Sequence, residues 1–210
     1  MSHIQVSQRS DEWFKLRCGS LGASQIADAL ARTKSGYGAS RYNVMAQLIA
    51  ERMTGMAQEG YTNAAMQRGI EVEPEARDAY AFLRGVEVSE CGMFTHPEIP
   101  GTHASPDGLI AEDGLLELKC PNTATHIETL LSGKVPGKYY QQIMWQLACS
   151  GRKWCDFVSY DNRMPGNLML FVQRIERDDD AISELETGVR DFLVEMQRKI
   201  EQLEALRSQS

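Results

Sequence analysis

The sequence predicts an α/β fold in which helices flank a mixed central β-sheet. Three observations support this prediction: helical segments come first, two pairs of strand-like segments follow with a helix between them, and a long amphipathic helix closes the chain. Elements in this order bury their apolar faces when helices pack against the faces of a sheet.

The first predicted helix runs from Ser40 to about Met53. Ser40 can cap its start, and Gly55 can end it, because glycine readily adopts the left-handed conformation found after many helices. Val44 and Leu48 recur at helical spacing and predict its buried side.

A second predicted helix covers roughly residues 62–83 and stops before Gly85. Pro74 interrupts it, since proline lacks a backbone N–H and clashes with the preceding turn. Either Pro74 sits in a first turn or the helix kinks there, and Glu73 lies at this irregularity.

Five segments have the composition and alternation of strands. They are residues 86–89, 102–110, 115–120, 154–160 and 168–175, with a helix over 139–149 before the last two. Asp113-Gly114 marks the turn before 115–120, and residues 161–166 form the turn between the last two strands. Alternation in 115–120 directs Leu116, Leu118 and Cys120 to a core and directs Glu117 and Lys119 to the other side.

The last predicted element is an amphipathic helix over about residues 180–207. Its apolar residues recur at spacings of mostly three and four; they are Ile182, Leu185, Val189, Phe192, Met196 and Leu203. This pattern favours packing on the helix's own domain over a subunit contact. The length of 210 residues, without repeats or low-complexity segments, predicts a single domain over 1–210.

The composition argues against several classes of protein. With 42% hydrophobic and 24% charged residues, disorder is not indicated, and no apolar run reaches the length of a membrane span. The first residues lack the features of a signal peptide, so we expect a cytoplasmic protein without a membrane partner. The five cysteines are scattered and contain no C-x-x-C pair, which argues against disulfides and a four-thiolate zinc site.

The net charge of −7 argues against a broad basic surface for nucleic acid. The charge is unevenly distributed, however: residues 1–52 hold seven Lys or Arg and four Asp or Glu, whereas residues 176–210 hold five and ten. A nucleic-acid site would therefore be local, and would draw on the amino-terminal part of the chain and on a bound metal.

The candidate chemistry lies in Ser105-Pro106-Asp107-Gly108 and Leu115-Leu116-Glu117-Leu118-Lys119. Phosphodiester hydrolysis needs a divalent cation, a deprotonated water and a group that orients this water. Asp107 and Glu117 offer the oxygen ligands that Mg²⁺ or Mn²⁺ prefers, and Lys119 offers the amine. An exposed hairpin with a solvated Glu–Lys ion pair shows the same pattern, and the loop length leaves the strand register open.

Five blocks occur in a fixed order along the chain. They are Trp13-Phe14-Lys15-Leu16-Arg17 with Ala23-Ser24, Gly69-Ile70-Glu71-Val72-Glu73 with Ala76, Ser105-Pro106-Asp107-Gly108, Glu117-Leu118-Lys119-Cys120-Pro121, and Tyr139 with Gln142. Over most of its length the chain thereby resembles the phage-type alkaline exonucleases, the lambda exonuclease and YqaJ viral recombinase family. The resemblance implies their restriction-endonuclease-like PD-(D/E)xK fold.

The resemblance also implies a metal site. Asp107 and Glu117, with the backbone carbonyl of Leu118, would bind the metal, and Glu73 would stand near a second metal position. Lys119 would orient and activate the attacking water. The cofactor would be Mg²⁺, with Mn²⁺ as the alternative, and two ions about 4 Å apart can clamp the attacking and leaving oxygens.

Further positions match the residues with which the family binds DNA. A guanidinium, hydroxyl and amide set suits the terminal 5′-phosphate; this set is Arg17, Ser24, Ser105 and Gln142. Lys34 matches a contact to duplex DNA, with a plain solvated loop as the alternative. Met66 matches an apolar wedge that parts the two strands, with a core methionine as the alternative. The neighbouring Glu71 and Glu75 leave the third metal ligand open.

The resemblance implies a Mg²⁺-dependent exonuclease that degrades the 5′-ended strand of linear duplex DNA, releases mononucleotides and leaves a 3′ overhang for recombination. It further implies a homotrimer that encircles DNA and a single-strand annealing protein as partner. Two alternatives remain: an endonuclease or iron–sulfur nuclease of the same fold, the latter needing four suitable cysteines, and a DNA-end-binding scaffold without turnover.

Overall fold

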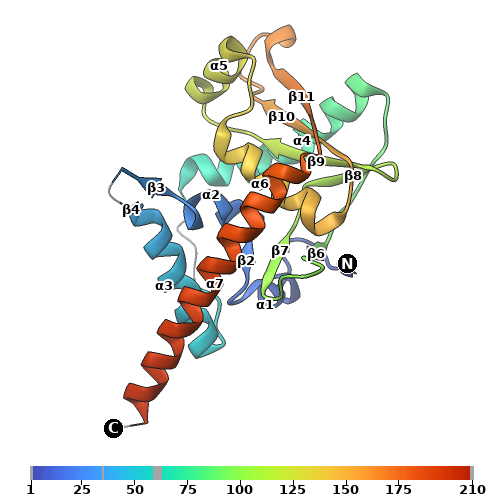
Figure 1. Cartoon of the computed structure of the whole chain (residues 1–210). Helices are drawn as coiled ribbons and strands as arrows, with labels where there is room; N and C mark the ends of the chain where they lie inside the picture. The colour runs from blue at the N-terminus through green and yellow to red at the C-terminus, as the bar shows by residue number, and fades with distance from the viewer. Residues whose placement is uncertain (1, 35, 59–62, 209–210) are drawn as a thin grey trace.

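The computed structural model describes residues 2–34, 36–58 and 63–208 (Figure 1). Its α-helices are α1 (Asp11–Arg17), α2 (Ile26–Ala29), α3 (Ala39–Thr54), α4 (Ala64–Arg84), α5 (Thr123–Ser132), α6 (Gly137–Ser150) and α7 (Asp179–Arg207). Two short 3₁₀ helices are η1 (Ala23–Gln25) and η2 (Gly166–Leu168).

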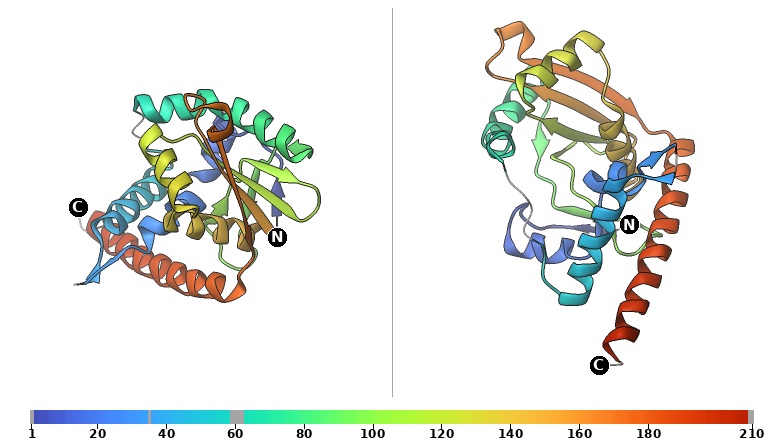
Figure 2. Two further views of the ribbon diagram at one scale, coloured as in Figure 1. Left: turned by 90° about the horizontal axis from the view of Figure 1, so that it is seen from above. Right: turned by 90° about the vertical axis from the view of Figure 1, so that its left-hand side faces the viewer.

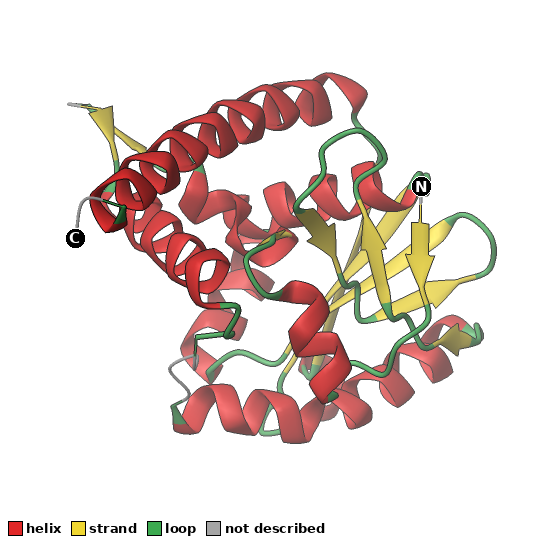
Figure 3. Cartoon of the chain, turned by 90° about the horizontal axis from the view of Figure 1, so that it is seen from below, coloured by secondary structure: helices red, strands yellow, loops and turns green. Residues whose placement is uncertain are grey.

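The strands form three sheets within the described residues. In chain order they are β1 (Ser2–Ile4), β2 (Leu21–Gly22), β3 (Arg32–Thr33), β4 (Gly36–Tyr37), β5 (Val88–Ser89), β6 (Met93–Thr95), β7 (Thr102–Ala104), β8 (Gly108–Ile110), β9 (Gly114–Lys119), β10 (Trp154–Tyr160) and β11 (Leu170–Glu176). The main sheet has the order β11-β10-β9-β8-β5, a second has the order β1-β6-β7-β2, and β3 pairs with β4. Figure 3 shows the sheets and helices from below.

The main sheet is mixed, as the sequence predicts. β9 and β10 run parallel, whereas β8–β9, β10–β11 and β5–β8 are antiparallel. Parallel neighbours require a crossover connection, and the chain from β9 to β10 contains α5 and α6. The register that the sequence left open pairs Gly108 with Leu116.

Helices cover both faces of the main sheet. On one face α4 packs Ala76 and Tyr80 against Leu116 and Leu118. On the other face, α6 and α7 share a larger apolar cluster with Leu115 and residues of the second sheet. Figure 2 shows α4 and α7 on opposite sides of the molecule. The predicted alternation in β9 is therefore present, but the side that carries Glu117 faces α6 and not solvent.

The helix predictions need two corrections. Ser40 does not cap α3, because the helix begins at Ala39 after Gly38, and the Ser40 hydroxyl donates to the backbone oxygen of Asp28 at 3.4 Å. Pro74 lies inside α4, well past a first turn, because the side chain of Asn63 caps the helix there and accepts from Met66 N. The predicted start at Thr62 lies outside the described residues. Gly55 and Gly85 close α3 and α4 in the left-handed conformation, as predicted.

The strand predictions fail where a short segment changes sheets. Residues 102–110 are not one strand: Thr102–Ala104 is β7 of the second sheet, and Gly108–Ile110 is β8 of the main sheet. Ser105, Pro106 and Asp107 form the link, and proline cannot donate to a strand ladder. The helices α1, α2 and α5 and the short strands β1 to β4 and β6 were not predicted from the sequence.

The closing helix α7 packs on the body of its own chain. Its buried residues include Val189, Phe192 and Met196, and the buried stripe extends to Ile200. Leu203, which the pattern placed on this face, is 40% exposed. No helix of the described residues combines the length and apolar character that crossing a bilayer requires. All five cysteines are free thiols.

Candidate active site

The turn into β8 fixes Asp107 against the neighbouring strand. Its backbone N–H donates to Leu116 O at 3.0 Å, and its Oδ2 accepts from Leu118 N at 2.6 Å. Gln8 holds the preceding residue in place, because its amide donates to Pro106 O at 2.8 Å. Asp107 is therefore held by two backbone contacts to β9 and by the Gln8 contact to the residue before it.

Glu117 is a buried carboxylate, and three side chains compensate its burial. It is 1% exposed, and its Oε1 and Oε2 accept from the Nε2 atoms of Gln142 and Gln146, each at 2.6 Å. Lys119 forms an ion pair with Oε1. Sequence reasoning found Gln142 but missed Gln146, although a spacing of four residues places both amides on one side of α6.

The two carboxyl groups and the lysine perturb one another electrostatically. Burial raises the pKa of Asp107 well above its usual range, and the charge of Glu117 raises it further, against the opposing effect of Lys119. Burial alone would lower the pKa of Lys119, but Glu117 and Asp107 together outweigh burial and raise it. Lys119 is therefore an ammonium group, which donates hydrogen bonds to water or phosphate.

The donor set fits a divalent cation. Asp107 and Glu117 are like charges that repel across a buried site, and a hard cation between oxygen ligands would relieve that repulsion. In the described part of the chain, no three His, Cys, Asp or Glu side chains form a ready-made metal site. Asp107 and Glu117 would therefore share a bound ion with water or substrate oxygens.

Glu73 is the carboxylate of α4 that faces this site. Its Oε2 accepts from Arg9 Nη2 at 2.6 Å and its Oε1 from Arg77 Nη2 at 3.4 Å, and Arg77 also donates to Asp107 O at 2.9 Å. Its charge contributes to the raised pKa of Asp107. Sequence reasoning missed both Arg9 and Arg77.

The two neighbouring glutamates have other partners. Glu75 accepts from Tyr160 Oη at 2.9 Å and from Asn162 Nδ2 at 2.7 Å, so it joins α4 to the end of β10. Glu71 is exposed and accepts from Gln67 within its own helix. Among the described residues, Glu73 is the only one of these three glutamates whose contacts, through Arg77, lead to Asp107.

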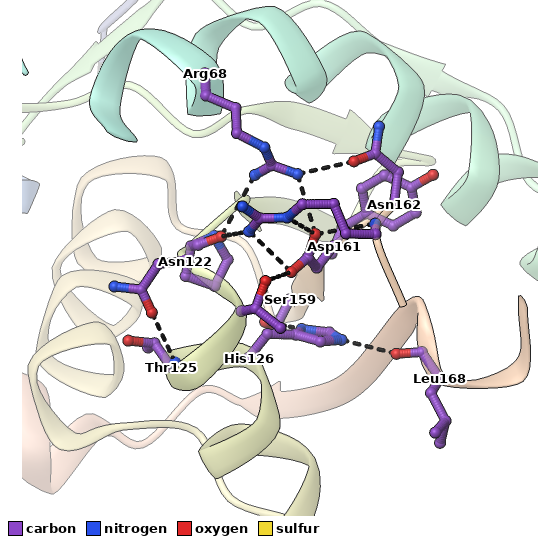
Figure 4. Close-up of polar contacts among 12 residues, drawn as sticks. Arg68, Asn122, Thr125, His126, Ser159, Asp161, Asn162 and Leu168 are labelled. Carbon is purple, nitrogen blue, oxygen red and sulfur yellow. Dashed lines mark hydrogen bonds and ion pairs between the residues drawn. The ribbon is translucent and has the colours of Figure 1, made fainter. Parts of the chain in front are cut away.

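A polar network at the end of β10 fixes the first turns of α4 (Figure 4). Asp161 is fully buried and accepts from Arg68 of α4 at 3.0 Å, from Arg163 at 2.7 Å and from Thr123 at 2.6 Å. Beside it, His126 contacts Ser159 and Leu168 O. The network ties α4, α5 and the β10–β11 connection together at the edge where β9 ends with Lys119.

The predicted phosphate-binding residues lie beside the carboxylates. Arg17 of α1 stacks over the Trp13 ring at 3.8 Å, and Trp13 Nε1 donates to Ser105 Oγ at 3.2 Å. Burial lowers the pKa of Arg17 to about 10, so its guanidinium remains charged at neutral pH. No described residue forms an ion pair with it. The charge of Glu51 reaches Arg17 and opposes the effect of burial on its pKa. A partly buried guanidinium without an ion pair is suited to a phosphate anion that arrives with the substrate.

One cavity of about 190 Å³ brings both groups of residues together. Seven residues predicted from sequence line it: Asp107, Glu117, Lys119, Arg17, Ser24, Ser105 and Gln142. His103, which sequence reasoning missed, also lines it and contacts Ser20 Oγ through Nδ1 at 2.9 Å. Burial and the nearby Arg17 lower the pKa of His103 to about 3, so its ring is neutral.

Four predicted residues do not line this cavity. Glu73 lines a neighbouring cavity of about 520 Å³ together with Asp107. Leu118 is 5% exposed and contributes its backbone N–H to Asp107. Lys34 is exposed beside β3, and Met66 is 53% exposed in the first turn of α4, so it is not a core methionine. Neither Lys34 nor Met66 is among the described residues that line the cavity.

Residues 12–153 match the YqaJ-like viral recombinase domain. This match covers more than half of the chain and contains all five sequence blocks. The chain belongs to the YqaJ-like viral recombinase family.

Solved structures support this membership. The chain is 50% identical to LHK-Exo, an alkaline exonuclease from Laribacter hongkongensis, with a TM-score of 0.88 over 95% of this chain and 99% of that one. A crystal structure of LHK-Exo in complex with dAMP gives a TM-score of 0.89 at the same identity and coverage. The YqaJ-like chain therefore has the PD-(D/E)xK-type fold of the alkaline exonucleases.

The chain also resembles more distant proteins, one by structure and one by sequence. A phage-related exonuclease from Haemophilus somnus matches with a TM-score of 0.68 at 13% identity, over 88% of this chain and 96% of that one. An uncharacterized protein of Acanthamoeba polyphaga mimivirus is 26% identical over 167 residues, which is 73% of this chain. The match spans 29% of the mimivirus protein.

Proposed function

We propose that this protein is a Mg²⁺-dependent exonuclease that degrades the 5′-ended strand of linear double-stranded DNA. It releases 5′-mononucleotides and leaves a 3′ overhang for recombination by strand annealing. The main support is the cavity that joins Asp107, Glu117 and Lys119 to the Arg17 guanidinium, which is partly buried and forms no ion pair with the residues that the structure describes. Membership of the YqaJ-like family and 50% identity to an alkaline exonuclease add to it.

Different residues of the cavity have different roles in the proposed reaction. Asp107 and Glu117 hold the cations, and Gln142 and Gln146 keep the Glu117 carboxylate in place. Mg²⁺, when bound, polarises the scissile phosphate and lowers the pKa of the attacking water. Lys119, as an ammonium, orients that water or stabilises the charge that develops on the phosphate.

Arg17, Ser24, Ser105 and Gln142 receive the terminal 5′-phosphate. A guanidinium fork and hydroxyl donors bind a phosphate dianion with charge-assisted hydrogen bonds. Since the same cavity contains Lys119, a terminal nucleotide seated there has its outer phosphate at Arg17 and its inner phosphate at the carboxylates. This arrangement gives the 5′-to-3′ polarity. The 5′-mononucleotide dAMP, which LHK-Exo binds, has the chemistry of the expected product.

The family resemblance supports three further roles. Glu73 serves a second metal position, with Mn²⁺ as an alternative to Mg²⁺. Lys34 contacts the duplex, and exposed Met66 acts as the wedge between the strands. The protein works as a homotrimer that encircles DNA, with a single-strand annealing protein as partner.

The decisive experiment measures nucleotide release from linear duplex DNA labelled at either end, with a 5′-phosphate or a 5′-hydroxyl, in Mg²⁺ or EDTA. Wild type is compared with Lys119→Ala and with Lys138→Ala. Lys138 is the matched control, because both lysines lie near the Tyr139 ring: Nζ is 4.7 Å from the ring centre in Lys138 and 5.0 Å in Lys119. Unlike Lys119, Lys138 is exposed and does not line the cavity. In wild type and Lys138→Ala we expect Mg²⁺-dependent release of nucleotides from the 5′ end, at a higher rate when that end carries a phosphate. In Lys119→Ala we expect no release.

Other results would replace the proposal. Internal cuts in circular DNA would identify an endonuclease of the same fold. Binding of DNA ends without nucleotide release in any divalent metal would identify a recombination scaffold.

A further inference from the structure

The segment that precedes α1 separates three cavities, and Arg9 lines all of them. One cavity of about 190 Å³ holds the candidate active site, one of about 340 Å³ extends along α1 and α3, and one of about 520 Å³ lies beyond Asp107. A guanidinium at this junction can reach the space where the terminal nucleotide would lie. Arg9 belongs to none of the sequence blocks that predicted the site.

The neighbours of Arg9 hold its backbone firmly. The Gln8 amide donates to Cys91 O and to Pro106 O, both at 2.8 Å, and the Ser10 side chain caps α1 by accepting from Trp13 N. Arg9 itself has a φ of +67°, a left-handed conformation that non-glycine residues rarely adopt. Such conformations persist where the surroundings enforce them, often at functional sites. Arg9 is thus fixed between the Asp107 turn and the helix that carries Arg17.

The side chain of Arg9 pairs with Glu73. Its Nη2 lies 2.6 Å from Glu73 Oε2, and the two side chains are 46% and 18% exposed. Arg77 also contacts Glu73 at 3.4 Å, but Arg77 donates in addition to Asp107 O. Within the described residues, Glu73 is the only polar partner of the Arg9 side chain. Of the two guanidiniums, Arg9 is therefore the one free to leave.

The pairing weakens the Glu73 carboxylate as a metal ligand. The Arg9 guanidinium, 2.6 Å from Glu73 Oε2, occupies one of the acceptor sites of that oxygen and offsets its negative charge, so the carboxylate attracts a cation less strongly. Partly exposed ion pairs are weak, so a stronger anion can take Arg9 from Glu73. A DNA phosphate is such an anion, because its oxygens match the guanidinium fork.

We propose that Arg9 is a substrate-binding residue that exchanges partners: it pairs with Glu73 in the free protein and moves to a backbone phosphate of the terminal nucleotide when DNA binds. The exchange releases Glu73 to the metal site, so that the complete site assembles on the substrate. This inference rests on the proposed exonuclease function, and it adds Arg9 to the residues that recognise DNA.

The first test measures the affinity for 5′-phosphorylated duplex ends in EDTA, by fluorescence anisotropy, so that no cleavage occurs. Glu73→Gln removes the competitor of Arg9, and we expect it to tighten binding more than Glu71→Gln, which removes an equal charge from the same helix but does not contact Arg9. Arg9→Gln in the Glu73→Gln background should weaken binding about tenfold. Arg9→Gln in the wild-type background should reduce the affinity for DNA ends by a smaller factor. Arg9→Lys should retain part of that affinity.

The second test measures Mn²⁺ binding without DNA, by electron paramagnetic resonance of the free ion. Arg9→Gln should tighten Mn²⁺ binding severalfold relative to wild type, because Glu73 is released, and Glu73→Gln should abolish that gain. Equal Mn²⁺ affinity in wild type and Arg9→Gln would overturn the exchange. It would also be overturned if Arg9→Gln reduced the affinity for DNA ends equally in wild type and in the Glu73→Gln background. Failure of wild type to bind DNA ends would instead overturn the proposed function on which it rests.

Discussion

At the scale of single residues, the site depends on how a buried charge is compensated. Glu117 is almost inaccessible, and its two oxygens receive amide donors from α6 in addition to Lys119. A buried acceptor that loses its donor retains the desolvation cost without compensation. Gln146, which also lines the cavity, therefore supports the active site by holding the Glu117 carboxylate.

Replacement of Gln146 tests this role. Gln146→Leu keeps the volume but leaves Glu117 Oε2 without its donor, so we expect the free energy of unfolding to fall by about 1–3 kcal/mol. Urea denaturation measures this loss. Gln197→Leu, on the exposed side of α7, should stay within about 0.5 kcal/mol of wild type. Equal stability of the two variants would mean that Gln146 does not compensate Glu117.

Arg17 should determine the preference for phosphorylated ends. Its charge has no ionic partner among the described residues, and Trp13 fixes its plane. Because hydrogen bonds to charged groups contribute about 1.5–3 kcal/mol, Arg17→Gln should reduce the preference for 5′-phosphate over 5′-hydroxyl ends by tenfold or more. Initial rates on both substrates measure this ratio. Lys15→Gln, an exposed change on the same helix, should preserve it; a parallel loss on both substrates would contradict the assignment.

The sequence identifies the centre of the site because its members are close along the chain. Asp107, Glu117 and Lys119 belong to one hairpin, and the turn at Asp113-Gly114 brings them together. Arg9 meets Glu73 across 64 residues, and Gln146 meets Glu117 across 29. Contacts of that separation depend on how helices cross the sheet, which no local pattern specifies.

At the scale of elements, Asp161 connects α4, α5 and the end of β10. Burial alone would raise the pKa of this carboxyl, but hydrogen bonds from Arg163 and Thr123 outweigh burial and hold it well below its usual range. A carboxyl with a depressed folded-state pKa stabilises the protein fully above its unfolded pKa of about 4. That stabilisation disappears as the pH falls through the lower, folded-state value.

Asp161→Asn should therefore change the acid limb of the stability profile. We expect the variant to be less stable at neutral pH, because Arg68 and Arg163 lose their buried partner. Its stability should also fall less steeply than that of wild type below about pH 4. Thermal unfolding followed across pH 2–7 measures both effects. Curves that run parallel in wild type and variant would show that Asp161 does not titrate as argued.

The amino-terminal strand depends on a close backbone approach at Gly92. A Cβ at this position would lie 2.2 Å from Ile4 O and 2.7 Å from Val6 N, both backbone atoms that cannot rotate away. Gly92→Ala should therefore displace the segment that leads to Gln8 and cost about 1–3 kcal/mol. Gly137→Ala is the control, because a Cβ there meets nothing within 4 Å. Urea midpoints compare the two, and equal midpoints would refute the steric argument.

Long elements are predictable here, and short ones are not. β10 and α7 follow patterns of alternation and helical spacing over many residues, and the structure agrees with the predicted bounds within a residue or two. β1, β2 and β7 have two or three residues each, too few for any periodicity to emerge. The prediction of one strand over 102–110 was wrong because each half pairs with a different sheet.

At the scale of the whole molecule, the proposed function requires a chain with a net charge of −7 to hold polyanionic DNA. Binding through many phosphate contacts would weaken steeply with salt, because each neutralised phosphate releases counterions. The basic groups at the site are few and local: Arg9, Arg17 and Lys119 line the cavity. Retention of the substrate would therefore need a mechanism other than a large basic face, and the proposed encircling homotrimer would supply one.

If a ring holds the DNA, salt should affect loading and not retention. If three copies of the 23.5 kDa chain encircle DNA, the rate of initiation should fall steeply as salt rises, whereas the number of nucleotides removed per encounter should stay nearly constant. Run lengths are measured by adding excess unlabelled duplex after loading, and native mass spectrometry gives the assembly at each salt concentration. Dilution below the assembly threshold should shorten the runs, because an open subunit dissociates after each cut. Run lengths that decline with salt in parallel with initiation, while the trimer persists, would mean that direct charge contacts retain the DNA and that no ring is needed.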